Sequence, residues 1–344
     1  MAAAALAGWL GAAAMAASAE EPKEKPKRRP DRSTVQGSVV GESTFLDAPP
    51  FPGLDITTPF RIQLETFTAP DASMGSGHVT VVRPEVGLRA TWPMNDRAVL
   101  RIATRFAESR YRFRGDAWAR TIALPSGQNL DADEVIGDLD LHGARLALEG
   151  AYHLSDKTNW LANGERWSAV GTAYIGSRWE DGDFDSGLDA AGGLGVGYEI
   201  PERLRLALGV VLRSPLDEAD LDVGPLFSLR WRPVDRITVR TRELGLQVEY
   251  ALTPAFEVHL NGFRSSNGYR LNDRDQLGDL SFRDRYIRFG IGIDWSLANW
   301  LNLELEGGGV AERILRVRDE DGGTLFSRRA DPSAYFEIRF NLRL

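Results

Sequence analysis

The last eleven residues of the chain, 334–344, alternate strictly between apolar and polar side chains. A period of two predicts a β-strand with one apolar and one polar face. Glu337 and Arg339 belong to the polar face of this predicted strand. The apolar face consists of Phe336, Ile338, Phe340, Leu342 and Leu344.

Alternating segments of the same kind recur from about residue 56 onward. In the segment 204–212, aliphatic side chains fill the even positions, while Arg205 and Gly209 fall on the other face. The predicted strands lie near 60–65, 82–92, 100–105, 145–153, 166–180, 187–200, 203–213, 223–232, 236–242, 244–252, 256–265, 285–297, 301–315 and 334–344. The tally is about fourteen, an even number, as single-chain bacterial barrels require. The pair within 236–252 is the least regular, and twelve strands would remain without it.

Short and long connections alternate between these strands. The short ones carry Pro, Asn or Asp, which suit tight turns, and lie at 93–96, 201–202, 233–235, 253–255 and 298–300. The long ones are mostly polar and lie at 114–137, 214–222, 267–284 and 316–333. Short turns on one side and long loops on the other match the two ends of an outer-membrane barrel.

Aromatic residues gather near the short turns. A lower aromatic girdle would sit at this interface, although ordinary packing at strand ends would also place aromatics there. The seven positions are Trp92, Tyr152, Trp167, Trp231, Tyr250, Trp295 and Trp300.

Together these features resemble the bacterial outer-membrane β-barrel superfamily over residues 56–344, in particular porin-like families of unassigned function. The resemblance implies an all-β fold, a transmembrane antiparallel up-and-down barrel. It also implies that the barrel assembly machinery recognises the apolar face of the terminal strand as an assembly signal. The chain ends on Leu344, whereas the terminal residue in those proteins is usually aromatic.

The N-terminal residues predict export. Residues 2–19 are apolar and end in Ala17-Ser18-Ala19, a small-residue cleavage site, so we interpret 1–19 as a signal peptide, although a positively charged start is missing. A transmembrane helix is the alternative. Residues 20–55 begin with a charged, Pro-rich run that cannot bury a core and predict a periplasmic linker and pre-barrel segment.

Composition narrows the function class. The net charge is −8, from 41 Lys+Arg against 49 Asp+Glu, which argues against a nucleic-acid partner. The chain has no cysteine, so disulfides and thiolate sites are excluded. The slightly negative mean hydropathy excludes a helical membrane protein but not a barrel, because half of each barrel strand is polar.

No catalytic or metal-binding signature stands out, so we expect no enzyme, cofactor or metal. The four histidines, His78, His142, His153 and His259, lie on separate segments without metal-ligand spacing. The run 192–197 looks like a phosphate loop but lies within an alternating strand that no helix follows. Glycines there would relieve strand curvature or leave space in the lumen.

Inward-facing charges suggest two opposed walls in the lumen, which would set a transverse field across an aqueous pore. The alternative is that these residues pair across strands and stabilise the barrel. The basic wall would comprise Arg83, Arg89, Arg101, Arg105, Arg145, Arg203 and Arg205. The acidic wall would comprise Glu65, Glu304, Glu306 and Glu337.

We therefore predict an outer-membrane, porin-like channel for passive diffusion of small polar solutes. Its partners would be outer-membrane lipid, the assembly machinery and small solutes, and a homo-oligomer stays open. Two alternatives are a structural barrel with a filled lumen and a transporter of a hydrophobic ligand. Inward apolar candidates for the latter are Phe67, Val211 and Phe263, too few for an apolar path. Less favoured are a barrel-embedded hydrolase and a secreted β-sandwich.

Overall fold

The structure is a computed structural model that describes most of the chain from Phe60 onward. The described residues are 60–95, 97–118, 121–123, 129–132, 136–154, 166–180, 184, 187–214, 222–242, 244–272, 277–319 and 322–344. The predicted signal peptide 1–19, the predicted linker 20–55 and residues 56–59 of the predicted barrel lie outside them. Among the described residues, no helix is long and apolar enough to cross a membrane.

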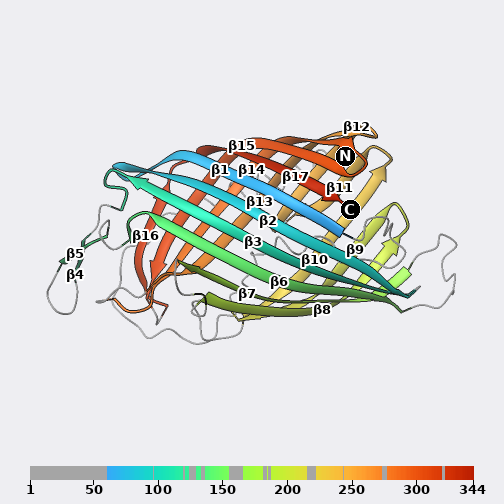
Figure 1. Ribbon diagram of the computed structural model, residues 1–344, viewed down its shortest axis with the longest axis horizontal. Coiled ribbons are helices and arrows are strands. Elements are labelled where there is room, and N and C mark those ends of the chain that lie inside the picture. Colours follow the sequence, from blue (N-terminus) through green and yellow to red (C-terminus); the bar gives the residue numbers. More distant parts are fainter. Residues whose placement is uncertain are drawn as a thin grey trace, which may run out of the picture. The chain divides into compact units, whose positions relative to one another are not determined.

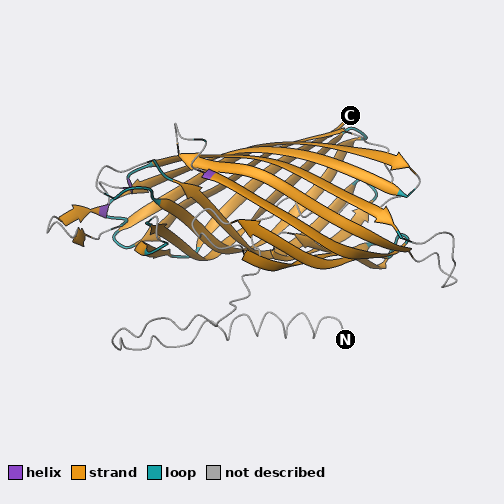
Figure 2. Cartoon of the chain, turned by 90° about the horizontal axis from the view of Figure 1, so that it is seen from below, coloured by secondary structure: helices purple, strands orange, loops and turns teal. Residues whose placement is uncertain are grey.

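Strands make up nearly all of the described chain (Figure 2). Their bounds are β1 (Phe60–Met74), β2 (Gly77–Asn95), β3 (Ala98–Arg114), β4 (Thr121–Ala123), β5 (Asn129–Asp131), β6 (Leu139–His153), β7 (Arg166–Glu180), β8 (Leu188–Ile200), β9 (Leu204–Ser214), β10 (Asp222–Val234), β11 (Ile237–Arg242), β12 (Leu244–Thr253), β13 (Phe256–Arg270), β14 (Ser281–Ala298), β15 (Leu301–Arg318), β16 (Thr324–Ala330) and β17 (Ser333–Arg343).

Fourteen of the described strands close into one antiparallel barrel (Figure 1). Neighbours in sequence pair with one another, and β17 completes the ring between β1 and β15. The closing pairing runs from Arg61 opposite Arg343 to Thr68 opposite Phe336. β4 and β5 form a separate two-stranded sheet, and β16 pairs with β15 beyond the start of β17. The predicted fold and the count of fourteen are confirmed, including the pair β11 and β12.

The two faces of the wall follow the predicted alternation. Leu208, Val210 and Leu212 on β9 point outward and are about half exposed. All seven aromatics of the predicted girdle lie among the exposed large apolar side chains. Lipid removes such a surface from water, and a continuous apolar exterior is what a membrane barrel needs.

We call the end where β1 begins and β17 ends the turn end, and the opposite end the loop end. Three connections break the predicted alternation of short turns and long loops. One is at the loop end, where β11 stops at Arg242 and β12 starts at Leu244. At the loop end a two-residue turn, Gly75 and Ser76, joins β1 to β2. At the turn end β6 stops at His153 and β7 starts only at Arg166, so this connection is long.

Three predicted loops also differ from the structure. The predicted loop 316–333 contains β16, and the predicted loop 267–284 is shortened by β13 and β14. The predicted polar loop 114–137 contains Trp118 and Ile136, which are almost fully buried. Burial of these two apolar side chains therefore holds parts of the segment against the barrel, although most of its residues are polar.

The strands between β10 and β13 are short, so the barrel wall has a small height there. β11 has only six residues, and β12 pairs with β13 only as far as Leu244 opposite Arg264. The remainder of β13 leaves this neighbour, and its last residue, Arg270, pairs in parallel with Trp179 of β7. Near the loop end, β7 and β13 thus approach each other and narrow the lumen.

Glycines allow β8 and β9 to approach each other closely in the barrel wall. Gly195 of β8 faces Gly209 of β9, and a Cβ on Gly209 would collide with the Leu194 carbonyl oxygen and the Gly195 Cα. A Cβ on Gly193 would lie 2.8 Å from Val211 Cγ2. The predicted role of the 192–197 glycines in curvature and lumen space fits this packing.

Replacing Gly209 by Ala should destabilise the barrel by about 1–3 kcal/mol, because the added methyl meets backbone atoms that have to move. Gly309→Ala is the matched control, since nothing lies within 4 Å of its Cβ position. Thermal unfolding in detergent, followed by far-UV circular dichroism, measures both. Equal melting temperatures for the two variants would contradict the claim that the close approach of β8 and β9 requires glycine at position 209.

Candidate functional site

A buried ionic cluster crosses the lumen toward β15 and β17. It joins the four predicted acidic-wall residues to three arginines, and we call it the Arg/Glu cluster. Its members are Glu65, Glu304, Glu306, Glu337, Arg242, Arg288 and Arg339. The structure thus brings all four predicted glutamates together, on the neighbouring strands β1, β15 and β17.

Arg339 lies at the centre of the wall side of this cluster. Its Nε donates to Glu65 Oε2 at 2.7 Å, and its Nη1 donates to Glu304 Oε2 at 2.7 Å. Its Nη2 donates to Glu337 Oε1 at 2.8 Å. A charge-assisted bond therefore leaves from each nitrogen of the guanidinium, the geometry for which Arg is suited.

Arg242 reaches the same carboxylates from β11, which is separated from β17 by four strands of the barrel. Its Nη1 lies 3.0 Å from Glu304 Oε1 and 2.9 Å from Glu306 Oε2. Its Nη2 lies 2.9 Å from Glu337 Oε1. The side chain therefore reaches past β12, β13 and β14 on the lumen side and occupies part of the cross-section.

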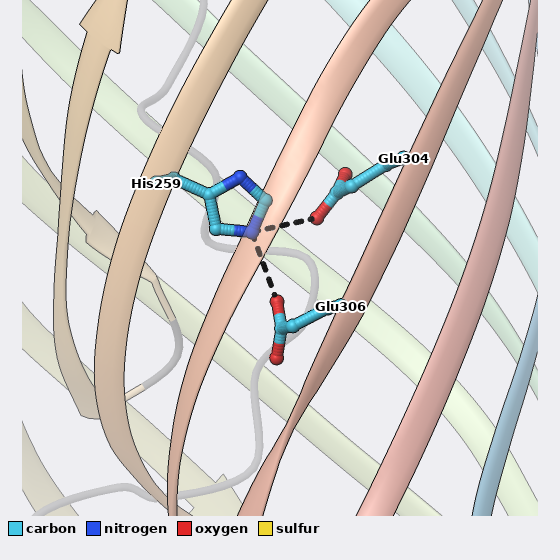
Figure 3. A group of neighbouring side chains, drawn as sticks. All are labelled: His259, Glu304 and Glu306. Carbon is cyan, nitrogen blue, oxygen red and sulfur yellow. Dashed lines mark hydrogen bonds and ion pairs between the residues drawn. The ribbon is translucent and has the colours of Figure 1, made fainter.

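His259 completes a group that could hold a metal ion (Figure 3). Its Nε2 lies 3.3 Å from Glu306 Oε2 and 3.9 Å from Glu304 Oε1, and all three residues are buried. Imidazole and carboxylate donors suit a divalent transition metal. The Arg242 guanidinium already donates to the same two oxygens and supplies the positive charge there.

A glycine lets His259 reach these glutamates. His259 lies on β13 and Glu306 on β15, with β14 between them, and Gly292 of β14 stands opposite both residues. A Cβ on Gly292 would collide with the imidazole. The ring therefore passes over Gly292 to the next strand but one.

The predicted basic wall is dispersed over several ion pairs. Arg101 pairs with Glu149 at 3.0 Å, Arg205 pairs with Glu199 at 2.9 Å, and Arg105 pairs with Glu85. Arg203 lies in the turn before β9, is about half exposed, and is 3.7 Å from Asp235. Arg89 lies on β2 opposite Arg61 and Ala103. Pairing across strands, the alternative to a bare basic wall, describes most of these residues.

A second ionic group surrounds Asp189, whose side chain is fully buried. Arg178 donates to its Oδ2 at 2.7 Å. Arg145 and Arg213 lie 3.4 and 3.9 Å from the same oxygen. Three arginines thus share one carboxylate on the wall formed by β6 to β9.

Toward the loop end the interior is apolar. Inward side chains of the strands and residues of the segment after β3 form one buried hydrophobic cluster, with Tyr111, Trp118, Phe282 and Phe326 among its fully buried members. Phe67 belongs to it and stacks on Tyr286 at a centroid distance of 6.0 Å. Buried apolar residues at this end are therefore more numerous than the three predicted candidates, Phe67, Val211 and Phe263.

A cavity of about 100 Å³ lies in the lumen between these zones. Its lining comes from β1, β2, β3, β6 and β7 on one side and from β13 and β14 on the other. Five arginines border it, Arg83, Arg105, Arg145, Arg178 and Arg288, with two glutamates, Glu65 and Glu85. Arginines therefore outnumber glutamates in the lining of this cavity.

Sequence reasoning missed Arg242, Arg288, Arg339 and His259 as partners of the acidic wall. Arg339 carried a signal, because it alternates with Glu337 on the same polar face of the terminal strand. Arg242 carried none, since its partners lie 62, 64 and 95 positions away. His259 could have been found only by noticing that Gly292 stands opposite it.

No family model matches this chain, and no curated protein is similar to it. Solved structures with a similar fold include an outer membrane channel from Pseudomonas putida F1, at 12% identity and TM-score 0.44, covering 88% of this chain and 100% of that one. The TodX monoaromatic hydrocarbon channel aligns at 12% identity and TM-score 0.36, over 83% and 90%. The Ralstonia pickettii toluene transporter TbuX aligns at 12% and 0.33, over 83% and 89%.

Replacing Arg242 by Met should destabilise the barrel by about 3–5 kcal/mol, because it leaves buried carboxylates with an uncompensated charge. Arg240→Met is the control, because Arg240 lies on the same face of β11 but is 36% exposed and pairs only with Glu249. An exposed pair contributes about 0–1 kcal/mol. Urea unfolding in detergent compares the variants, and similar midpoints would show that the Arg/Glu cluster does not depend on Arg242.

Proposed function

We propose that the protein is an outer-membrane channel through which small polar solutes diffuse passively. The observation that carries this proposal is the cavity inside the lumen, bordered from opposite walls by five arginines and two glutamates. Hydrated charged side chains offer hydrogen bonds to a solute that loses water as it enters a narrow pore. The apolar exterior provides the bilayer contact that such a channel needs.

The buried side chains set the expected size of the pore. Arg242 occupies part of the lumen within the Arg/Glu cluster, and the apolar cluster lies in the interior toward the loop end. A path past these groups is narrow, so we expect a small conductance and exclusion of large solutes. The five arginines against two glutamates around the cavity should favour anions over cations.

The apolar cluster favours a second candidate, a transporter of a hydrophobic ligand. Aromatic rings such as Phe67, Phe282 and Phe326 would contact an apolar ligand at the loop end. Phe67 already packs against Tyr286, Phe282 against Tyr111 and Phe326 against Trp118, so a ligand would have to displace these rings. The same packing fits a structural barrel with a filled lumen.

Refolded protein in a planar bilayer should show a small, steady conductance. In a salt gradient, the sign of its reversal potential should report anion preference, because Arg residues dominate the cavity. Inserted protein that never conducts, but whose tryptophan fluorescence responds to a monoaromatic hydrocarbon, would replace this proposal by the hydrophobic transporter.

Arg105→Ser should shift the reversal potential toward cations, because it removes a cavity arginine and leaves Glu85 without this partner. Arg101→Ser is the matched control, since Arg101 lies on the same strand and is not part of the lining. Equal shifts of the reversal potential for both variants would show that ion selectivity does not depend on the arginines of the cavity.

A further inference from the structure

Arg83 differs from the other four cavity arginines in its partners. Arg105, Arg145, Arg178 and Arg288 each lie within ion-pair distance of a carboxylate. Arg83 instead donates from Nε to Ser109 Oγ at 2.8 Å, from Nη1 to Tyr286 OH at 3.2 Å, and from Nη2 to Tyr111 OH at 3.3 Å. All of these acceptors are neutral oxygens.

Tyr111 connects Arg83 to a carboxylate that forms an ion pair with another arginine. Tyr111 OH donates to Asp284 Oδ2 at 2.9 Å. Asp284 is fully buried and forms a two-pronged ion pair with Arg313, at 3.1 and 2.6 Å. Asp284 therefore contacts Arg313 directly and Arg83 only through Tyr111. A charge in a poorly hydrated site is stabilised by a counterion.

Asn267 occupies the end of the Arg83 guanidinium. With its amide oxygen turned toward Arg83, it accepts from Nη1 and from Nη2, each at 3.1 Å. One oxygen thus accepts from both outer nitrogens, the end of the guanidinium that a carboxylate or phosphate contacts with two oxygens. A side-chain amide, a neutral and weaker acceptor, thus stands where an oxyanion would bind.

The rest of the cavity suits an anion as well. Tyr286 OH and Ser266 border the cavity and can donate hydrogen bonds. On the opposite side, Arg145 and Arg178 belong to the group in which three arginines share Asp189. The cavity of about 100 Å³ is smaller than the roughly 150 Å³ cavity that holds benzene, so the ligand has to be small.

We propose that the cavity is a binding site for a small oxyanion, a carboxylate or phosphate group, which displaces the Asn267 amide and pairs with the Arg83 guanidinium. The site rests on the proposed channel and deepens it, because it would make passage saturable and selective for such anions. Tyr286 OH supplies a further donor.

The test measures binding of inorganic phosphate and of acetate to the folded barrel in detergent, by isothermal titration calorimetry at constant ionic strength. One saturable site per chain is expected for at least one of them. Arg83→Gln should weaken binding tenfold or more, while Arg205→Gln, an inward arginine paired with Glu199 outside the cavity, should leave it unchanged. Binding of phosphate alone would identify phosphoryl ligands, and binding of both would identify carboxylates too.

A second variant keeps Arg83 in place. Asn267→Asp puts a tethered carboxylate beside the guanidinium, so it should raise the melting temperature and abolish anion binding. Asn267→Ala removes the competing amide and should bind the anion at least as tightly as the unmodified barrel. Absence of saturable binding to the unmodified barrel, or unimpaired binding by Asn267→Asp, would overturn the proposal.

The anion site and the channel fail in different ways. A barrel that binds phosphate in detergent but never conducts keeps the site and loses the channel. A barrel whose current rises linearly with phosphate concentration, without saturation and identically in Arg83→Gln, keeps the channel and loses the site.

Discussion

Compensation of charge inside a confined lumen is the constraint on which this structure depends. A barrel wall has to alternate, so half of its residues point inward, and in this chain many of those are Arg or Glu. Removing such charges from water is costly unless each finds an opposite charge and hydrogen bonds. Arg242 and Arg339 meet this requirement by each contacting three of the four glutamates of the Arg/Glu cluster.

Glycine makes these contacts sterically feasible. Side chains on the concave face of a curved sheet converge, so large residues on adjacent strands collide there. Gly292 lets His259 pass over β14, and a Cβ on Gly290 would collide with the Tyr335 hydroxyl, which donates to Glu306 at 2.5 Å. The glycines of β14 therefore belong to the ionic cluster as much as the charged residues do. At Gly195 and Gly209 the lack of a side chain lets β8 and β9 approach each other closely.

The sequence predicted the fold well because alternation is a local property. Period-two patterns located all fourteen barrel strands, and the even count placed both ends of the barrel together. It failed at 324–330, where β16 continues along β15, and at Trp118, because burial of that side chain depends on strands distant in the chain. The four glutamates lie together, because closure brings β1 beside β17. The arginine that joins them across the lumen, Arg242, has partners that no local pattern reveals.

The strand order also bears on how the barrel forms. Almost every pairing joins strands that are neighbours in the chain, so hairpins can form one after another with small losses of loop entropy. Besides the single parallel contact between β7 and β13, the exception is the pairing of β1 with β17, which joins segments from opposite ends of the barrel sequence. Until that pairing forms, β1 and β17 each present an open edge, and two such edges can as readily meet on different molecules. Closure therefore marks the step of assembly at which folding competes with aggregation.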